Sequence, residues 1–191
     1  MPGRPRDRDL ERRLLAAAWG MLTEGSYAAL TLAQVAARAG AHRSDVYRRW
    51  PTKTRLVADT LAAHLPPVSD VDTGSLLSDI RVYVDDLARS WSAPWMDSLV
   101  GWLADLAEDA DAEAVFRTVS LDRGRSLRLA LGRAVERGEI AELPDPQLVS
   151  GLLEGPLMHC RIIGRRPPSA GFLDAVASSA YRVIVAPAAA R

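Results

Sequence analysis

The stretch from Thr31 to Lys53, TLAQVAARAGAHRSDVYRRWPTK, restricts the possible folds of this chain more than any other part of it. Thr31 is followed three residues later by Gln34, which is the capping-box spacing that begins a helix. Gly40 can adopt the left-handed backbone conformation that ends a helix. A second short helix is expected over about 43–50. Two short helices joined by a tight turn with glycine form a helix-turn-helix.

The second of these helices has two different faces. Val46 and Trp50 lie four residues apart and form an apolar side that is expected to bury against the first helix. The outward side carries Arg43, Ser44, Tyr47 and Arg48. Arginine can pair with the guanine edge in the DNA major groove, while tyrosine and serine hydroxyls donate to phosphates. A solvated charged face is the alternative. Because the helix cap, the glycine turn and the basic face occur together, we expect DNA recognition.

This segment resembles a known family closely. TLAQVAARAG and AHRSDVYRRWPTKTRLV are similar to the DNA-binding segment of TetR-family transcriptional regulators, over about fifty residues from Leu10. The similarity rests on the Ala39-Gly40 turn, on Tyr47 and Trp50, and on the motif Pro51-Thr52-Lys53. It implies a three-helix DNA-binding domain in which Lys53 contacts a phosphate. The candidate DNA-contacting residues are Thr31, His42, Arg43, Ser44, Tyr47, Arg48, Thr52 and Lys53.

Two positions depart from the family pattern. His42 stands where serine is usual, so the side-chain cap is lost, although a hydrogen-bond donor is kept. Asp45 stands where a small or hydroxyl residue is usual. Its carboxylate has two possible roles. It can support the start of the helix and pair with Arg49 four residues on, or it can accept a hydrogen bond from a cytosine amino group.

Composition and charge agree with contact to nucleic acid at one end only. The 191 residues are 48% hydrophobic, which is enough for one or two domains with a real core. The net charge is zero, but residues 1–60 carry +5 and the remainder carries −5. Arg4, Arg6 and Arg8 could form an arm that reaches DNA, or remain a solvated tail.

The only cysteine, Cys160, cannot form an intramolecular disulfide. No apolar run reaches the length of about 18 residues that a membrane span requires. Together these features predict a cytoplasmic protein.

The rest of the chain also reads as helical, so the expected fold is all-α with about nine helices. Besides the two helices of the motif, we expect helices over about 9–24, 53–65, 75–90, 94–107, 111–137, 146–164 and 169–185. The linker-like composition of PPVSDVDTG predicts a boundary. We therefore expect a helix-turn-helix domain at 1–65, a linker at 66–74, and a ligand-binding and dimerisation domain at 75–191.

The C-terminal part also resembles the family. EGPLMHCRIIGRRPP is similar to the eighth helix and following turn of one TetR subgroup. This resemblance implies a homodimer formed by the eighth and ninth helices, 146–164 and 169–185, and an effector cavity among the fifth to eighth helices. Small residues independently permit close helix packing there. They are Gly151, Gly155, Ala175, Ala177 and Ala180.

Aromatic residues concentrate in the helices expected between 75 and 137. They form either ordinary core or the walls of the effector cavity, and both interpretations remain open. The candidate effector-binding residues are Tyr83, Trp95, Trp102, Phe116, Arg117, Ser120 and His159.

No motif for catalysis or for phosphate or dinucleotide binding is present. The acidic residues between 105 and 113 are better explained by a helix N-terminus than by a metal site, so neither metal nor cofactor is expected. The resemblance to TetR-family regulators then implies a regulator that binds double-stranded DNA, a repressor released from a palindromic operator by a small molecule. The alternatives are a DNA-binding regulator without an effector, or a helical enzyme.

Overall fold

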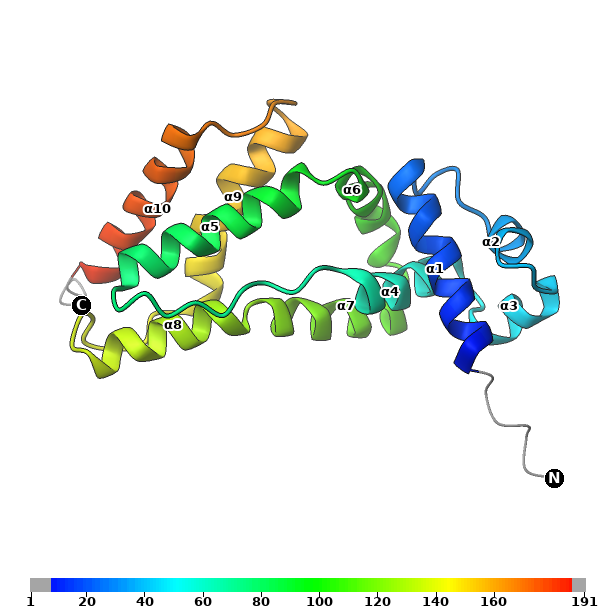
Figure 1. Ribbon diagram of the computed structural model, residues 1–191, viewed down its shortest axis with the longest axis horizontal. Coiled ribbons are helices and arrows are strands. Elements are labelled where there is room, and N and C mark those ends of the chain that lie inside the picture. The colour runs from blue at the N-terminus through cyan, green and yellow to red at the C-terminus, as the bar shows by residue number, and fades with distance from the viewer. Residues whose placement is uncertain (1–7, 187–191) are drawn as a thin grey trace, which may run out of the picture. The chain divides into compact units, whose positions relative to one another are not determined.

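The computed structural model describes residues 8–186, so that Arg4 and Arg6 of the possible DNA-reaching arm lie outside the described residues. Within this range there are ten helices and no strand (Figure 1), as expected for an all-α fold. From the N-terminus these are α1 (Arg8–Glu24), α2 (Leu32–Arg38), α3 (Arg43–Arg49), α4 (Lys53–His64), α5 (Leu76–Ser92), α6 (Trp95–Leu106), α7 (Ala110–Arg123), α8 (Arg125–Glu136), α9 (Pro146–Ile162) and α10 (Ala170–Val185).

The tenth helix arises because the single helix expected over 111–137 is divided at Gly124 into α7 and α8. Glycine is about 0.8–1.0 kcal/mol less favourable than alanine inside a helix, so it is a natural place for an interruption. The remaining helices begin and end within two residues of the expected positions. Apolar periodicity therefore located the helices correctly and missed only this interruption.

The chain contacts divide the structure into two compact units. Unit 1 comprises the residues up to Leu65 together with Pro94–Ser120, and thus α1–α4, α6 and most of α7. Unit 2 comprises Pro66–Ala93 and the residues from Leu121 onward, and thus α5 and α8–α10. The segment of α6, which the sequence assigned to a C-terminal domain, packs with the N-terminal helices. The division into functional domains remains a prediction.

In unit 1, α1 is the central helix. It packs against α4, α2 and α6, and in Figure 1 it lies between α6 and α2. Leu14 and Ala18 of α1 are fully buried, as are Val35 of α2, Val46 of α3 and Leu56 of α4. Each helix therefore contributes its apolar face to one shared core, which fixes the orientation of α3 within the unit.

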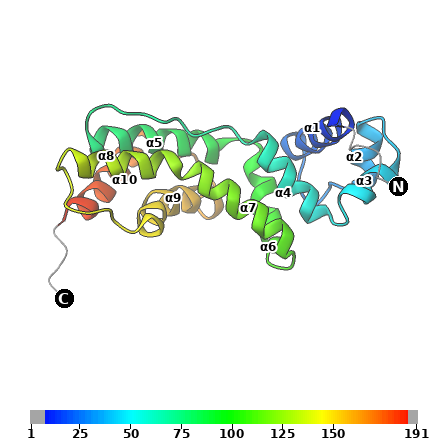
Figure 2. The ribbon, with the colours of Figure 1, turned by 90° about the horizontal axis from the view of Figure 1, so that it is seen from below.

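In unit 2, α5 is the central helix and packs against α8, α9 and α10. Figure 2 shows α8 running alongside α5. Leu76, Ile80, Leu131, Leu153 and Leu157 are fully buried in this second core. Each unit therefore has its own hydrophobic core, formed by the apolar faces of its own helices.

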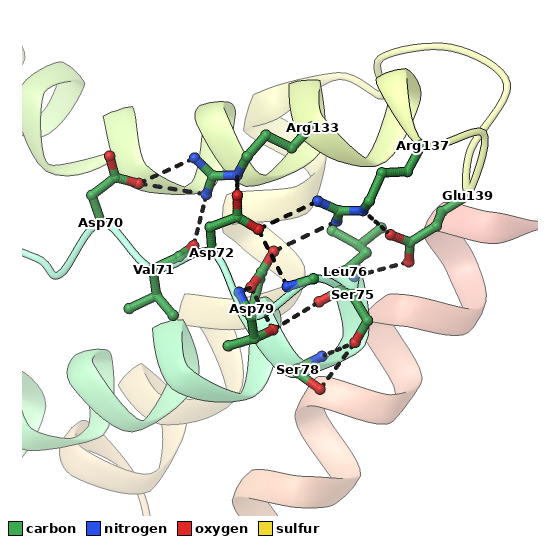
Figure 3. A network of polar contacts seen from close by, with 12 residues as sticks. Asp70, Val71, Asp72, Ser75, Leu76, Ser78, Asp79, Arg133, Arg137 and Glu139 are labelled. Atoms are coloured by element: carbon green, nitrogen blue, oxygen red, sulfur yellow. Dashed lines mark hydrogen bonds and ion pairs between the residues drawn. The ribbon is translucent and has the colours of Figure 1, made fainter.

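The predicted linker at 66–74 contains no helix, and it is fastened along unit 2 by specific bonds (Figure 3). Arg133 of α8 donates to the backbone carbonyl of Val71 at 2.7 Å. The buried carboxylate of Asp79 on α5 accepts from the backbone N–H and the hydroxyl of Thr73, both at 2.7 Å. Its composition is that of a linker, but its polar groups are held in place.

Candidate nucleic-acid interface

The first helix of the motif begins and ends as the sequence predicts. The Thr31 hydroxyl accepts the backbone N–H of Gln34 at 3.2 Å, and it donates to the Gln34 side-chain oxygen at 2.7 Å. Gly40 has a φ of +62°, in the left-handed region. The backbone N–H of Ala41 then bonds the carbonyl of Ala36 at 2.9 Å, which is the Schellman pattern. The turn therefore has a defined shape that sets the direction of α3.

Helix α3 has the two faces that the sequence predicts. Val46 and Trp50 are buried in the core of unit 1, and the Trp50 indole N–H donates to Asp59 at 2.8 Å. The four residues of the outward face are exposed, namely Arg43, Ser44, Tyr47 and Arg48. Their exposure confirms the prediction that they face outward; their contacts with DNA remain a prediction.

The first departure from the family pattern has the expected structural consequence. His42 is the residue that precedes α3, and its side chain makes no capping hydrogen bond. It is exposed beside the outward face. A histidine ring nitrogen at this place is therefore free of a capping role and available as a donor.

The second departure, Asp45, lies in the first turn of α3 and contacts two arginines. Its carboxylate is 2.6 Å from Nη2 of Arg48 and 3.9 Å from Nη1 of Arg49. Arg49 also donates to the backbone carbonyl of Asp45 at 3.0 Å. The sequence predicted the pair with Arg49, but the shorter contact with Arg48 was missed, although the three-residue spacing was a signal for it.

The start of α4 presents the other two candidate DNA contacts, and both already have partners within the chain. The Thr52 hydroxyl accepts the backbone N–H of Arg55 at 3.0 Å and donates to Asp109 at 2.6 Å. Nζ of Lys53 donates to the backbone carbonyl of Tyr27 at 3.2 Å and lies 3.8 Å from the centroid of the Tyr27 ring. These contacts fix both side chains in the absence of DNA.

Two residues of α6 hydrogen-bond to the start of α4 and to Tyr27. The indole N–H of Trp102 donates to the backbone carbonyl of Thr54 at 3.1 Å. One turn later, Asp105 accepts the hydroxyl of Tyr27 at 2.6 Å. Burial, helped by this bond to a carboxylate, raises the pKa of Tyr27 to about 12, so its hydroxyl stays protonated. These supports are not predictable from the sequence, because the partners are far apart along the chain.

The turn between α6 and α7 brings acidic residues to the start of α4. Asp109 caps α7 by accepting the backbone N–H of Ala112 at 3.0 Å. The hydrogen bonds from Thr52 and then from Ala112 lower the pKa of Asp109, so it is ionised at neutral pH. An open groove of about 590 Å³ lies here, lined in part by Thr52, Arg55 and Asp111. Among residues 8–186, no group of three or more His, Cys, Asp or Glu is arranged to hold a metal ion.

The residues predicted to bind an effector are divided between the two units. Trp95, Trp102 and Phe116 belong to unit 1, where the Trp102 and Phe116 rings meet edge to face at 5.2 Å. Trp95 and Trp102 are buried there against the N-terminal helices. These two aromatic residues therefore belong to ordinary core. Arg117 and Ser120 are exposed on α7.

The other two candidates lie in unit 2. His159 is exposed on α9, and Tyr83 is buried on α5. Burial raises the pKa of Tyr83 to about 12, and the charges of Glu154 and Arg123 also act on it. The cavity that Tyr83 lines has a volume of about 10 Å³, room for at most one water molecule. A ligand in this cavity would therefore have to open the helices around it.

Comparison with known families covers most of the chain. Residues 14–60 match the family described as "Bacterial regulatory proteins, tetR family". Residues 70–180 match the family described as "Tetracyclin repressor-like, C-terminal domain". This chain belongs to the TetR family of transcriptional regulators. It is thus a helix-turn-helix DNA-binding regulator, and its family is one of regulators and not of enzymes.

Relatives and solved structures support the same assignment over nearly the whole chain. "DNA-binding transcriptional repressor TetR" of Mycobacteroides abscessus is 30% identical over 92% of this chain and 94% of its own. "Uncharacterized HTH-type transcriptional regulator YdeS" of Bacillus subtilis is 27% identical over 84% and 82%, respectively. The crystal structure of the TetR-family regulator SCO0332 matches with a TM-score of 0.70 and 25% identity, covering 94% of this chain and 100% of that one.

The TetR-family regulators bind DNA, typically as dimers, and respond to small molecules. Within residues 8–186 of this regulator, no helix is both long and apolar enough to cross a membrane.

Proposed function

We propose that this TetR-family regulator is a repressor that binds a palindromic operator as a homodimer and leaves it when a small molecule binds. The observation that carries the proposal is the exposed face of α3, where Arg43, Tyr47 and Arg48 project from a helix whose other side is anchored in the core. A relative that is 30% identical over most of its length is named a repressor, which supports repression over activation.

The homodimer is proposed to form through α9 and α10. Leu148, Gly151, Gly155, Met158 and Ile162 follow one another at spacings of three and four residues on α9, and all are exposed. The exposed fractions of Leu148, Met158 and Ile162 are 54%, 41% and 37%. A continuous apolar stripe of this kind is typical of a helix that packs against a partner. A Cβ atom placed on Gly151 or Gly155 would meet nothing within 4 Å, so both positions are open to a second helix.

Helix α10 offers a similar face beside it. Gly171, Ala175, Ser179 and Val183 recur at every fourth residue and are all exposed, and α9 and α10 pack against each other. Small residues allow helices to approach closely, so two copies of this pair of helices would form a four-helix bundle. The dimer would place two α3 helices in successive major grooves, roughly 34–36 Å apart, which requires a palindromic operator.

The effector is proposed to bind in unit 2 beside Tyr83. A buried hydroxyl that feels the charges of Glu154 and Arg123 within an apolar core is the combination that small-molecule sites use. The effector would have to bind the DNA-free state more tightly than the DNA-bound state, because only unequal affinities shift the equilibrium. The second candidate is a regulator without an effector, which the small cavity at Tyr83 favours.

DNA binding is tested by gel shift with the DNA upstream of the protein's own gene. Arg48→Ala should weaken operator binding by about 1–3 kcal/mol and relax the preference at one base pair in each half-site. Lys53→Ala should weaken binding to all sequences and reduce the salt dependence by about one counterion per subunit. Unchanged affinity and preference in both variants would contradict the assignment of α3 and α4 to DNA.

The dimer is tested with a matched pair of leucine variants. Leu148→Glu places a charge in the α9 stripe, whereas Leu121→Glu places one on an equally exposed leucine of α7; the exposed fractions are 54% and 57%. Sedimentation equilibrium should find a monomer for Leu148→Glu and a dimer for Leu121→Glu. A dimer for both would exclude the α9 stripe from the interface.

The effector is tested by thermal shift against a panel of compounds, followed by release of operator DNA. Tyr83→Phe should keep DNA binding but weaken the response to any compound that both stabilises the protein and releases DNA. If every stabilising compound acts equally on Tyr83→Phe, the effector does not use Tyr83. If no compound does both, the regulator without an effector is the better description.

A further inference from the structure

Asp45 places a negative charge on the helix that is proposed to enter the major groove. Its side chain is 22% exposed and lies against Arg48 and Arg49. A carboxylate that faces DNA opposes binding, because phosphates carry the same sign of charge. An ion pair as exposed as that with Arg48, whose side chain is 66% exposed, adds little to stability. The pair with Arg48 therefore contributes little to the fold, and its role is sought in the binding of DNA.

The two arginines beside Asp45 differ in what they can reach. The Arg49 side chain is 9% exposed, and its Nη1 donates to the Asp45 backbone carbonyl at 3.0 Å, so Arg49 is committed to the helix itself. Arg48 points outward and donates through Nη2 to the Asp45 carboxylate at 2.6 Å. A guanidinium has five N–H donors, so this bond leaves Arg48 with donors for a base.

Guanine offers two acceptors in the major groove, N7 and O6, to an arginine whose plane is correctly oriented. A long side chain normally loses rotamer freedom when it forms such a pair, and a contact that restricts it beforehand reduces that loss. We propose that Asp45 orients Arg48 for two-bond pairing with one guanine in each half-site. Asp45 is then a positioning residue that determines specificity, and this inference rests on the DNA-reading role proposed above.

The rival explanation is that Asp45 reads a base directly by accepting from the amino group of a cytosine. The two explanations differ in which base pair is affected. If Asp45 acts through Arg48, removing either side chain relaxes the same base pair. If Asp45 reads a cytosine itself, its removal relaxes a base pair that does not depend on Arg48.

The experiment measures competition between operator DNA and variants in which each base pair is replaced in both half-sites. It compares the full-length wild type with Asp45→Asn, Arg48→Ala and the double variant. Arg48→Ala should lose about 5- to 150-fold of discrimination at one base pair. Asp45→Asn should lose about two- to tenfold at that same base pair, the lower part of the range of coupling between residues in contact. The double variant should equal Arg48→Ala.

Asp45→Asn should also bind sequences that lack this guanine as tightly as the wild type or more tightly, because it removes a negative charge. A purely structural role would instead weaken binding to all sequences together, and that result would overturn the inference. Unchanged discrimination, relaxation at a different base pair, or additive losses in the double variant would overturn it as well. A wild type that discriminates between no sequences would refute the DNA-reading proposal itself, and this inference with it.

The matched control is Glu113→Gln on α7. It breaks another exposed ion pair, between Glu113 and Arg117 at 2.7 Å, and it should leave base discrimination unchanged. Melting temperatures of all variants should remain near that of the wild type, because Arg48 and Arg117 are exposed and the Asp45–Arg49 contact is long at 3.9 Å. A loss of discrimination in Glu113→Gln equal to that in Asp45→Asn would show a general charge effect and overturn the inference.

Discussion

Asp109→Asn should strengthen the binding of DNA. The Thr52 hydroxyl has a single proton and donates it to Asp109 at 2.6 Å, so it cannot donate to a phosphate until that bond breaks. The carboxylate also brings a negative charge next to the place where the phosphate would lie. Asparagine removes the charge and still caps α7 through the N–H of Ala112, because asparagine and aspartate are about equally good caps.

The size of the effect follows from Coulomb's law. A phosphate that accepted the Thr52 proton in place of Asp109 would lie about 5 Å from the Asp109 carboxylate, because each lies about one hydrogen-bond length from the Thr52 oxygen. At that distance two charges repel by about 0.8 kcal/mol in water and by about 3 kcal/mol at an effective dielectric constant of 20. The turn is open to solvent, so the lower value applies. We expect about 1 kcal/mol per subunit, or about fivefold for each half-site.

The assay is fluorescence anisotropy with labelled operator at low and high salt. The gain for Asp109→Asn should shrink as salt rises, because exposed charges are screened. Asp111→Asn is the matched control, since it removes a neighbouring charge from the same groove and leaves the Thr52 bond intact. An unchanged or lower affinity of Asp109→Asn, at an unchanged melting temperature, would refute the reasoning. An equal gain in affinity for Asp111→Asn would show that the gain for Asp109→Asn is a general effect of charge and does not depend on the Thr52 bond.

Three further predictions concern stability. Trp102→Ala should destabilise unit 1 by about 3–5 kcal/mol, seen in its denaturant midpoint, because Trp102 is 0% exposed. Gly40→Ala should cost about 1–2 kcal/mol, since Gly40 has a φ of +62°, whereas Gly132→Ala in the middle of α8 should be neutral or stabilising in thermal melts. The pKa of Glu139 lies below its ordinary 4.5, first because the carboxylate accepts the Leu76 N–H and second because of Arg137. The ionised Glu139 therefore stabilises the fold fully above pH 4.5, and this stabilisation is lost as the pH falls through the lowered pKa. Glu139→Gln should therefore melt at a lower temperature near neutral pH and lose part of the acid sensitivity.

The parts of the interface that depend on neighbouring residues could be predicted from the sequence. The Thr31 cap, the Gly40 turn and the two faces of α3 are set by spacings of three and four residues, and the structure has all of them. The ion pair between Asp45 and Arg48 is equally local. The sequence also offers Asp45 a partner four residues on, Arg49, so spacing alone does not decide between the two arginines.

The parts that depend on distant residues could not be predicted. Periodicity shows which face of α6 is buried, but it does not show which helix covers that face. Trp102 was therefore a candidate for an effector cavity, whereas it donates to Thr54, 48 positions earlier, in the core of unit 1. The bond between Thr52 and Asp109 spans 57 positions and leaves no trace in the pattern of either segment.

The exposed stripe on α9 has a consequence for how the regulator responds to its own abundance. If the stripe pairs two copies, the species that binds the operator forms in proportion to the square of the protomer concentration, as long as monomers predominate. Occupancy of the operator would then rise more steeply than the amount of protein. The affinity of the two copies for each other, to which the open positions at Gly151 and Gly155 would contribute, would thus set the amount of protein at which the operator becomes occupied.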